Sequence, residues 1–139
     1  MIVLDTSGLL SAIDSRQKSH ETAKRAIDDD PGPYLISPFV LAEMDYLLHA
    51  RIGVAAEMLF LAEVVRGAYR LEPFGPADVE LAAQVIGRYR DLGIGLTDAS
   101  VVVLAARVGT NRVLTLDERH FRAIRPLRGR AFTLLPADA

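Results

Sequence analysis

The chain has 139 residues, 50% of them hydrophobic, and a formal net charge of -2. This size predicts one compact domain spanning residues 1–139, and the charge excludes a globally basic nucleic-acid binder, so a nucleic-acid partner would need a local basic patch. The absence of cysteine excludes disulfides, thiolate zinc sites and cysteine nucleophiles.

The first half of the chain alternates short apolar runs with helix-forming segments. After the opening apolar run, Asp5-Thr6-Ser7-Gly8 mixes turn and N-cap residues, which predicts a tight turn into a helix. Ser37 before Pro38 is typical of a helix start, and the helix that follows is apolar on most sides, so we expect it to be mostly buried. The predicted elements are a strand at Ile2–Leu4, a helix after it, a charged helix from Ser19, its expected N-cap, to about Asp28, a strand at Tyr34–Ile36 and a helix from Pro38 to about Arg51.

The second half continues the same alternation. Pro76–Tyr89 has apolar residues at helical spacing, and we expect its apolar side to pack on the sheet. Thr97 is a good N-cap for the next helix, and Gly109 stands at the left-handed position that ends it. The predicted elements are a helix at Val54–Arg66, a weak strand at Tyr69–Pro73, a helix at Pro76–Tyr89, a helix at Asp98–Val108, a strand at Val113–Leu116 and a strand at Phe132–Leu135.

The order of these elements predicts the fold class. Strands that alternate with helices favour an α/β fold with three layers, α/β/α, around a short, mostly parallel central sheet. The first residues have no basic region before Asp5 and do not resemble a signal peptide, and the apolar run Val101–Ala106 is too short to cross a bilayer. We therefore expect a soluble, cytoplasmic protein with no membrane partner.

Four carboxylates stand where such a fold would bring them together. Asp5 follows the first strand, Asp117 follows a late strand, and Asp98 begins a late helix. The C-terminal ends of parallel strands and the N-terminal ends of the crossover helices share one edge of the sheet, where ligands bind. Glu43, inside an early helix, is the fourth acid. Because acids gathered at one edge repel each other unless a cation holds them, the pattern predicts a divalent-metal site.

Each acid also has a structural alternative. Asp5 could cap the first helix, and Asp98 could act only on the dipole of its own helix. Asp117 could cap the short turn that follows, with Glu118 as a rival for the ligand role. Glu43 interrupts an apolar stripe, so we expect it to be buried and to need a cation, either a metal ion or an arginine. The four alternatives would have to hold independently, whereas one metal site accounts for all of them.

Together these motifs resemble a known family. Asp5-Thr6-Ser7, the Val-Leu-Ala-Glu sequence ending at Glu43, Thr97-Asp98-Ala99 and Leu114-Thr115-Leu116-Asp117 are similar to the motifs of the PIN domain. The resemblance covers essentially the whole chain and is greatest to the VapC toxins of bacterial toxin–antitoxin pairs, which are small ribonucleases. The run Val101–Val103 departs from the more alanine-rich sequence of many relatives, which should affect packing rather than metal binding.

The resemblance implies a PIN-like fold and a metal-dependent endoribonuclease. Its products would carry a 5′-phosphate and a 3′-hydroxyl, and Mg²⁺ or Mn²⁺ would be the cofactor, as oxygen ligands suit these ions. Thr6 and Thr97, with Ser7 less clearly, could hydrogen-bond a ligand carboxylate or a phosphate, or act only as helix caps. A VapB-like antitoxin and a homodimer formed through Val54–Val65 are also implied. The carboxylates that would hold the metal and carry the catalysis are Asp5, Glu43, Asp98 and Asp117.

RNA binding would also require positive charge beside the acids. Basic residues cluster near Asp117, and they form either a rim that contacts phosphates or an ordinary solvated surface. Histidines at 20, 49 and 120 do not form a catalytic set, although His120 follows Asp117 closely. The candidate RNA-contacting residues are Arg112, Arg119, His120 and Arg122, and Arg125, Arg128 and Arg130 extend the cluster.

Two functions from other classes compete with this interpretation. A phosphatase of the haloacid dehalogenase type needs a second aspartate two residues after the first, and Ser7 occupies that position. A non-catalytic acidic module could bind a basic protein through the same carboxylates. Cleavage of RNA that depends on a metal ion separates the nuclease from this module.

Overall fold

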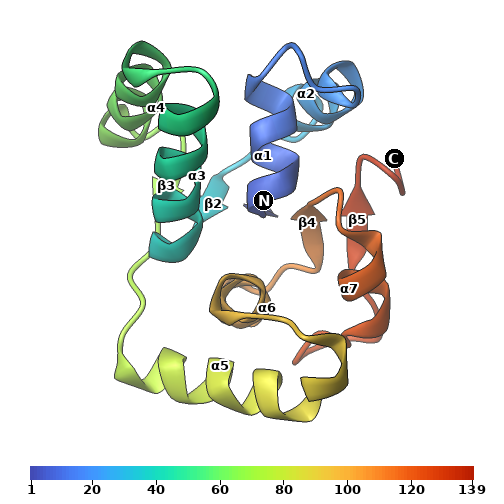
Figure 1. Ribbon diagram of the computed structural model, residues 1–139. Helices are drawn as coiled ribbons and strands as arrows, with labels where there is room; N and C mark the ends of the chain where they lie inside the picture. Colours follow the sequence, from blue (N-terminus) through green and yellow to red (C-terminus); the bar gives the residue numbers. More distant parts are fainter.

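The computed structural model describes residues 1–139 and contains a five-stranded sheet with seven α-helices around it (Figure 1). The strands are β1 (Ile2–Leu4), β2 (Tyr34–Ile36), β3 (Arg70–Leu71), β4 (Arg112–Leu114) and β5 (Thr133–Leu135). The helices are α1 (Thr6–Ile13), α2 (His20–Asp28), α3 (Pro38–Arg51), α4 (Val54–Arg66), α5 (Pro76–Arg88), α6 (Leu96–Val108) and α7 (Glu118–Ala123), with a 3₁₀ turn, η1 (Arg90–Leu92), between α5 and α6.

All strand pairs are parallel, and the order across the sheet is β3-β2-β1-β4-β5. The first strand is therefore central, with Val3 paired to Leu35 of β2 and to Val113 of β4. Because β1 and β4 are neighbours, the residues that follow them meet at the same edge, where the amide of Asp5 donates to the carbonyl of Leu114 at 2.9 Å. This register brings two predicted site segments together.

Helices cover both faces of the sheet, which confirms the α/β/α prediction. Helix α6 packs against β1 and β4, with α5 beyond it, and α1 and α2 lie on the other side (Figure 1). Residues Ala99–Ala105 of α6 are all buried, because this helix lies between the sheet and α5. The expectation that α5 packs on the sheet is therefore wrong: its apolar stripe, centred on Ala82 and Val85, packs on α6.

Helix α3 is less buried than its composition suggests. Only Val40, Met44 and Leu48 are buried, at intervals of four residues, whereas Tyr46 is 70% exposed. A single stripe of contact thus replaces the predicted burial on most sides. None of the helices of the protein is both long and apolar enough to cross a membrane.

The helix starts and strand ends differ in detail from the prediction. The hydroxyl of Ser37 accepts from the amide of Val40 at 3.1 Å, which confirms it as the cap of α3, whereas Ser19 makes no such bond. Thr97 is not a cap, because α6 begins at Leu96 and Gly95 is the N-cap. Strand β4 ends at Leu114, two residues before the predicted end, and β3 and β5 are also shorter than expected.

Candidate metal centre

Asp5 is a buried carboxylate at the end of β1. It is 4% exposed, and its Oδ2 accepts hydrogen bonds from Thr115 Oγ1 at 2.7 Å and Ser7 Oγ at 3.2 Å. Burial raises the pKa of Asp5 to about 6, and the negative charge of Asp98 adds to the shift, although the hydroxyls of Thr115 and Ser7 oppose it. Asp5 occupies the N-cap position of α1, but its side chain makes no capping bond there. Capping therefore does not account for this residue.

A glycine allows the first turn of α1 to lie against the end of β4. A Cβ atom at Gly8 would lie 2.6 Å from the carbonyl carbon and oxygen of Leu114, too close for any other residue without a backbone shift. The close approach lets Ser7 Oγ accept from the amide of Leu116 at 2.9 Å. The segment that leads to Asp117 is thereby fixed beside Asp5.

Glu43 is held by two threonine hydroxyls. Thr6 Oγ1 donates to its Oε1 at 2.7 Å, and Thr97 Oγ1 donates to its Oε2 at 2.8 Å, so three helices meet at this carboxylate. The expectation that Glu43 is buried is wrong, because it lies on an exposed face of α3. No arginine pairs with it either; neutral donors satisfy its oxygens.

Asp98 and Asp117 complete the acidic group from the ends of two other elements. Burial raises the pKa of Asp98, as does the charge of Asp117, while His120 opposes the shift. Asp117 caps α7, accepting from the amide of His120 at 3.1 Å through Oδ1. Its other oxygen, Oδ2, lies 2.7 Å from His120 Nδ1. The capping role and the place in the acidic group are thus both present in this residue.

All four predicted acids line one cleft of about 350 Å³. Thr6 and Ser7 also line it, as do Gln17 and Arg51, two donors that the sequence did not single out. Arg51 is exposed and its guanidinium forms no ion pair. It lies on α3, eight residues after Glu43, although the sequence-based prediction did not connect the two. The acids in the cleft are Asp5, Glu43, Asp98 and Asp117.

The structure adds a histidine to this group. One ligand atom from each of Asp98, Asp117 and His120 lies within 4.8 Å of the other two. In the sequence His120 was only a candidate contact for RNA, because nothing in its spacing shows that Asp98 lies nearby. The close pair Asp117–His120, three residues apart on a helical turn, is the one signal that could have pointed to it.

The predicted basic rim is only partly present. Arg112 begins β4, at the end of that strand away from Asp117, and pairs with Asp30 at 3.0 Å, so the structure does not bring it to the acidic group. Arg122 is engaged by Glu118 at 3.1 Å and by Asp138 at 2.6 Å. Arg119 is exposed and forms no ion pair. Arg125, Arg128 and Arg130 are exposed in the segment after α7.

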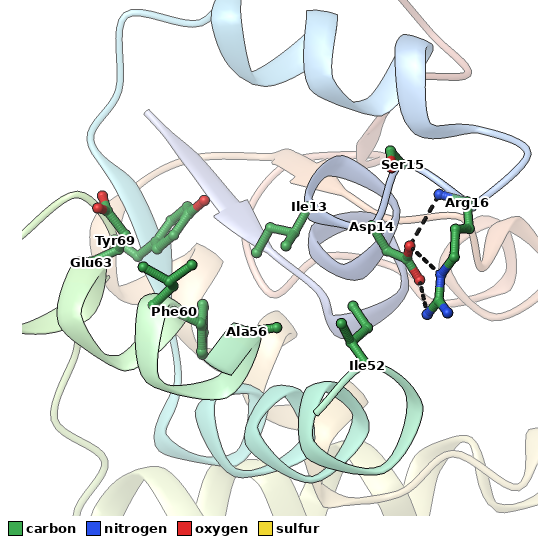
Figure 2. Close-up of a pocket in the computed structure, with 10 residues that line it drawn as sticks. Ile13, Asp14, Ser15, Arg16, Ile52, Ala56, Phe60, Glu63 and Tyr69 are labelled. Carbon is green, nitrogen blue, oxygen red and sulfur yellow. Dashed lines mark hydrogen bonds and ion pairs between the residues drawn. The ribbon is translucent and has the colours of Figure 1, made fainter. Parts of the chain in front are cut away.

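A second and larger cavity, of about 480 Å³, lies between the end of α1 and α4. Figure 2 shows Ile13, Ile52 and Phe60 around this space, with Tyr69 at one end and the ion pair of Asp14 and Arg16 at the other. The guanidinium of Arg16 also donates to the carbonyl of Arg51 at 3.2 Å, so the linings of the two cavities touch. The larger cavity is mainly apolar and contains none of the four acids.

Comparisons with known proteins agree with this architecture. Residues 2–126 match the PIN domain family. Ribonuclease VapC26 of Mycobacterium tuberculosis is 43% identical over 135 residues, which are 97% of this chain and 100% of that protein.

Solved structures share this fold. The VapC20 toxin of Mycobacterium tuberculosis, described as cleaving the sarcin–ricin loop, has a TM-score of 0.80 at 23% identity, covering 93% of this chain and 100% of its own. A toxin–antitoxin complex from Klebsiella pneumoniae gives a TM-score of 0.71 at 17% identity, covering 89% of this chain and 92% of the matched chain. The chain belongs to the PIN domain family, within its VapC group.

Proposed function

We propose that this protein is a metal-dependent endoribonuclease toxin that hydrolyses RNA phosphodiester bonds, leaves 5′-phosphate and 3′-hydroxyl ends, and is inhibited by a cognate antitoxin. The observation that carries the proposal is the gathering of four carboxylates in one cleft, with Asp5 buried among them and bonded only to neutral hydroxyls. The name of the relative that is 43% identical, Ribonuclease VapC26, supports the same activity.

The donor set fits a hard divalent cation. Oxygen ligands from a few carboxylates suit Mg²⁺ or Mn²⁺, and Asp5, Asp98 and Asp117, with Glu43, would hold the ion. When bound, the ion would neutralise charge on the scissile phosphate and make water a stronger nucleophile. The pKa of about 6 leaves Asp5 mainly ionised at neutral pH, as a ligand must be.

The hydroxyl groups around the acids fix their positions. Thr6 and Thr97 each donate to one oxygen of Glu43, which holds the carboxylate in one orientation and leaves lone pairs for water in the cleft. Thr115 and Ser7 both donate to Oδ2 of Asp5. These four residues are therefore positioning residues in the proposed reaction, and their hydroxyls supply no charge.

The substrate would enter the cleft as an exposed strand or loop. Arg51 and Gln17 line one side of the cleft and can donate to phosphate oxygens, as can the unpaired Arg119 outside it. A regular RNA helix hides its base edges in a deep groove, so a selective nuclease is expected to prefer unpaired RNA.

The apolar cavity of Figure 2 is where we place the antitoxin. Its lining meets that of the acidic cleft at Arg16 and Arg51, so one extended segment could fill both. Such a segment would need apolar side chains for the first cavity and a basic side chain for the second. A toxin–antitoxin complex among the structures of this fold supports a partner of this kind.

We also propose a homodimer formed by the outer side of α4. Val54, Met58 and Val65 lie along one stripe of that helix and are 61%, 59% and 90% exposed. A stripe of this kind is a candidate for self-association. Sedimentation of the wild type and Met58→Glu tests the idea: a dimer that the variant converts to monomer supports it, and a monomeric wild type excludes it.

The nuclease activity is tested by incubating the purified protein with total RNA, with Mn²⁺ or Mg²⁺ and with EDTA, and by mapping the cut ends. The proposal predicts cleavage that EDTA and Asp98→Asn abolish and that leaves 5′-phosphates. Asp29→Asn is the matched control, because Asp29 is exposed and lies outside the cleft. Intact RNA under every condition would instead favour the non-catalytic acidic module.

A further inference from the structure

His120 is oriented by a backbone carbonyl. Its Nε2 lies 3.1 Å from the carbonyl oxygen of Leu92, in the turn η1 that leads toward α6. A carbonyl oxygen only accepts hydrogen bonds, so Nε2 carries the hydrogen. In the neutral ring the other nitrogen, Nδ1, then presents a lone pair.

That lone pair faces the acidic group. Nδ1 lies 2.7 Å from Asp117 Oδ2 and 3.7 Å from Asp98 Oδ2, and the side chain of His120 is 21% exposed. Although these oxygens are close, Nδ1 is buried and forms no hydrogen bond. A nitrogen and two carboxylates that face one another without a shared hydrogen are an arrangement that a cation would stabilise.

We propose that His120 is a ligand of the cation, through Nδ1, beside Asp98 and Asp117. The inference rests on the proposed function and makes its metal site more specific. The three ligand atoms lie within 4.8 Å of one another, a separation that one shared ion can span. The hydrogen bond to Leu92 is the second support, since histidines that bind metals commonly donate their other N–H to a carbonyl.

A nitrogen ligand changes which ions the site prefers. Imidazole binds first-row transition ions well, whereas Mg²⁺ takes oxygen ligands almost exclusively. The wild type should therefore prefer Mn²⁺ to Mg²⁺, and His120→Ala should lower this preference about tenfold. The variant keeps the amide that donates to Asp117, so the start of α7 is preserved.

Electron spin-echo spectroscopy of the protein loaded with Mn²⁺ tests the ligand directly, without any activity assay. The proposal predicts a ¹⁴N coupling of coordinated strength in the wild type, lost in His120→Ala and retained in His49→Ala. His49 is the matched control because it pairs with Glu57 at 2.9 Å, outside the cleft. Titration of Mn²⁺ against Mg²⁺ in the same proteins measures the change in preference.

The possible outcomes separate this inference from the proposed function. Bound Mn²⁺ with no ¹⁴N coupling, or with a coupling that His120→Ala retains, would overturn the role of His120 and leave an oxygen-only nuclease site intact. Failure of the wild type to bind Mn²⁺ at all would overturn both. An equal fall in Mn²⁺ and Mg²⁺ affinity in His120→Ala, with the melting temperature unchanged, would show that the ring positions Asp117 without binding the ion.

Discussion

Asp30 and Asp5 are two buried aspartates that lie at opposite ends of β1. Their electrostatic environments differ in sign. Asp30 is 3% exposed and pairs with the N-terminal ammonium of Met1 at 3.1 Å and with Arg112 at 3.0 Å. Asp5 is 4% exposed and receives hydrogen bonds only from neutral hydroxyls, those of Thr115 and Ser7. The protein thus pairs Asp30 with two cations at one end of β1 and pairs Asp5 with none at the other.

The pKa values of the two groups follow from this difference. Burial raises the pKa of Asp30, but the amide of Gly32, the N-terminal ammonium and Arg112 outweigh it, so the net shift is downward. Burial raises the pKa of Asp5 to about 6, and its hydroxyl partners do not offset the shift. Asp30 belongs to a structural ion pair, whereas Asp5 has no ion-pair partner within the chain.

The largest expected effect comes from removing a charge at the acidic edge. Asp98→Asn should abolish RNA cleavage and leave the metal-free protein as stable as the wild type or more stable, because it removes repulsion from a carboxylate whose pKa is raised. Cleavage assays and thermal melts in EDTA measure the two effects. A marked loss of stability would make Asp98 a structural residue and would remove the contrast with Asp30.

The pH dependence of the metal-free protein should also reflect Asp5. Its folded-state pKa is raised from 3.8 to about 6, so the folded form binds the proton more tightly than the unfolded form. Protonated Asp5 therefore stabilises the folded form, and this stabilisation is fully present below the unfolded pKa. It is lost as the pH rises from about 4 to 6, which lowers the free energy of unfolding by about 3 kcal/mol.

Urea denaturation in EDTA at a series of pH values measures this change, with Asp5→Asn as the variant in which it should be absent. Saturating Mn²⁺ at pH 7 should restore stability, since the ion binds only the folded protein. A wild type and an Asp5→Asn variant with the same pH profile would contradict the assignment.

The opposite edge should respond in the opposite direction. Arg112→Ala removes a cation from Asp30 and should lower the free energy of unfolding by about 1 to 2 kcal/mol, because a buried carboxylate loses a charged partner while the N-terminal ammonium and the amide of Gly32 remain. The affinity for Mn²⁺ should not change. Denaturation of the variant measures the loss of stability, and calorimetric titration measures its affinity for Mn²⁺. A fall in Mn²⁺ affinity would show that the Asp30 ion pair and the acidic cleft are coupled.

The smallest effect is expected from the hydroxyls that hold Glu43. Thr97→Val removes one of its two donors without changing charge and should weaken Mn²⁺ binding about tenfold. Thr22→Val, on the exposed side of α2, is the control. Unchanged affinity in Thr97→Val would mean that Thr6 alone orients the carboxylate.

The sequence predicted the position of the acids better than their surroundings. Convergence of Asp5, Asp98 and Asp117 follows from the topology of a parallel sheet, which the alternation of strands and helices already indicates. The environment of Glu43 was misjudged because helical periodicity does not reveal which flank of a helix meets solvent. Hydroxyls from Thr6 and Thr97, 37 and 54 residues away in the chain, satisfy it instead.

Contacts between distant residues explain the other errors. Arg112 was assigned to the basic rim by its position in the sequence. Its partner, Asp30, is 82 residues away in the chain, and this pair lies at the end of the sheet opposite to the acidic group. The orientation of His120 depends on a carbonyl 28 residues away. Similarly, the apolar stripe of α5 is visible in the sequence, but its packing partner is not, because α6 is apolar on nearly every side. Local propensity carries no information on such pairings.

The most direct test of the central claim is a crystal structure of the protein soaked in Mn²⁺, with an anomalous difference map. We expect a strong peak in the cleft, within bonding distance of carboxylate oxygens of Asp5, Asp98 and Asp117. A map with no peak there, with these oxygens turned to solvent or to arginine side chains, would contradict the claim that the acids form a metal site.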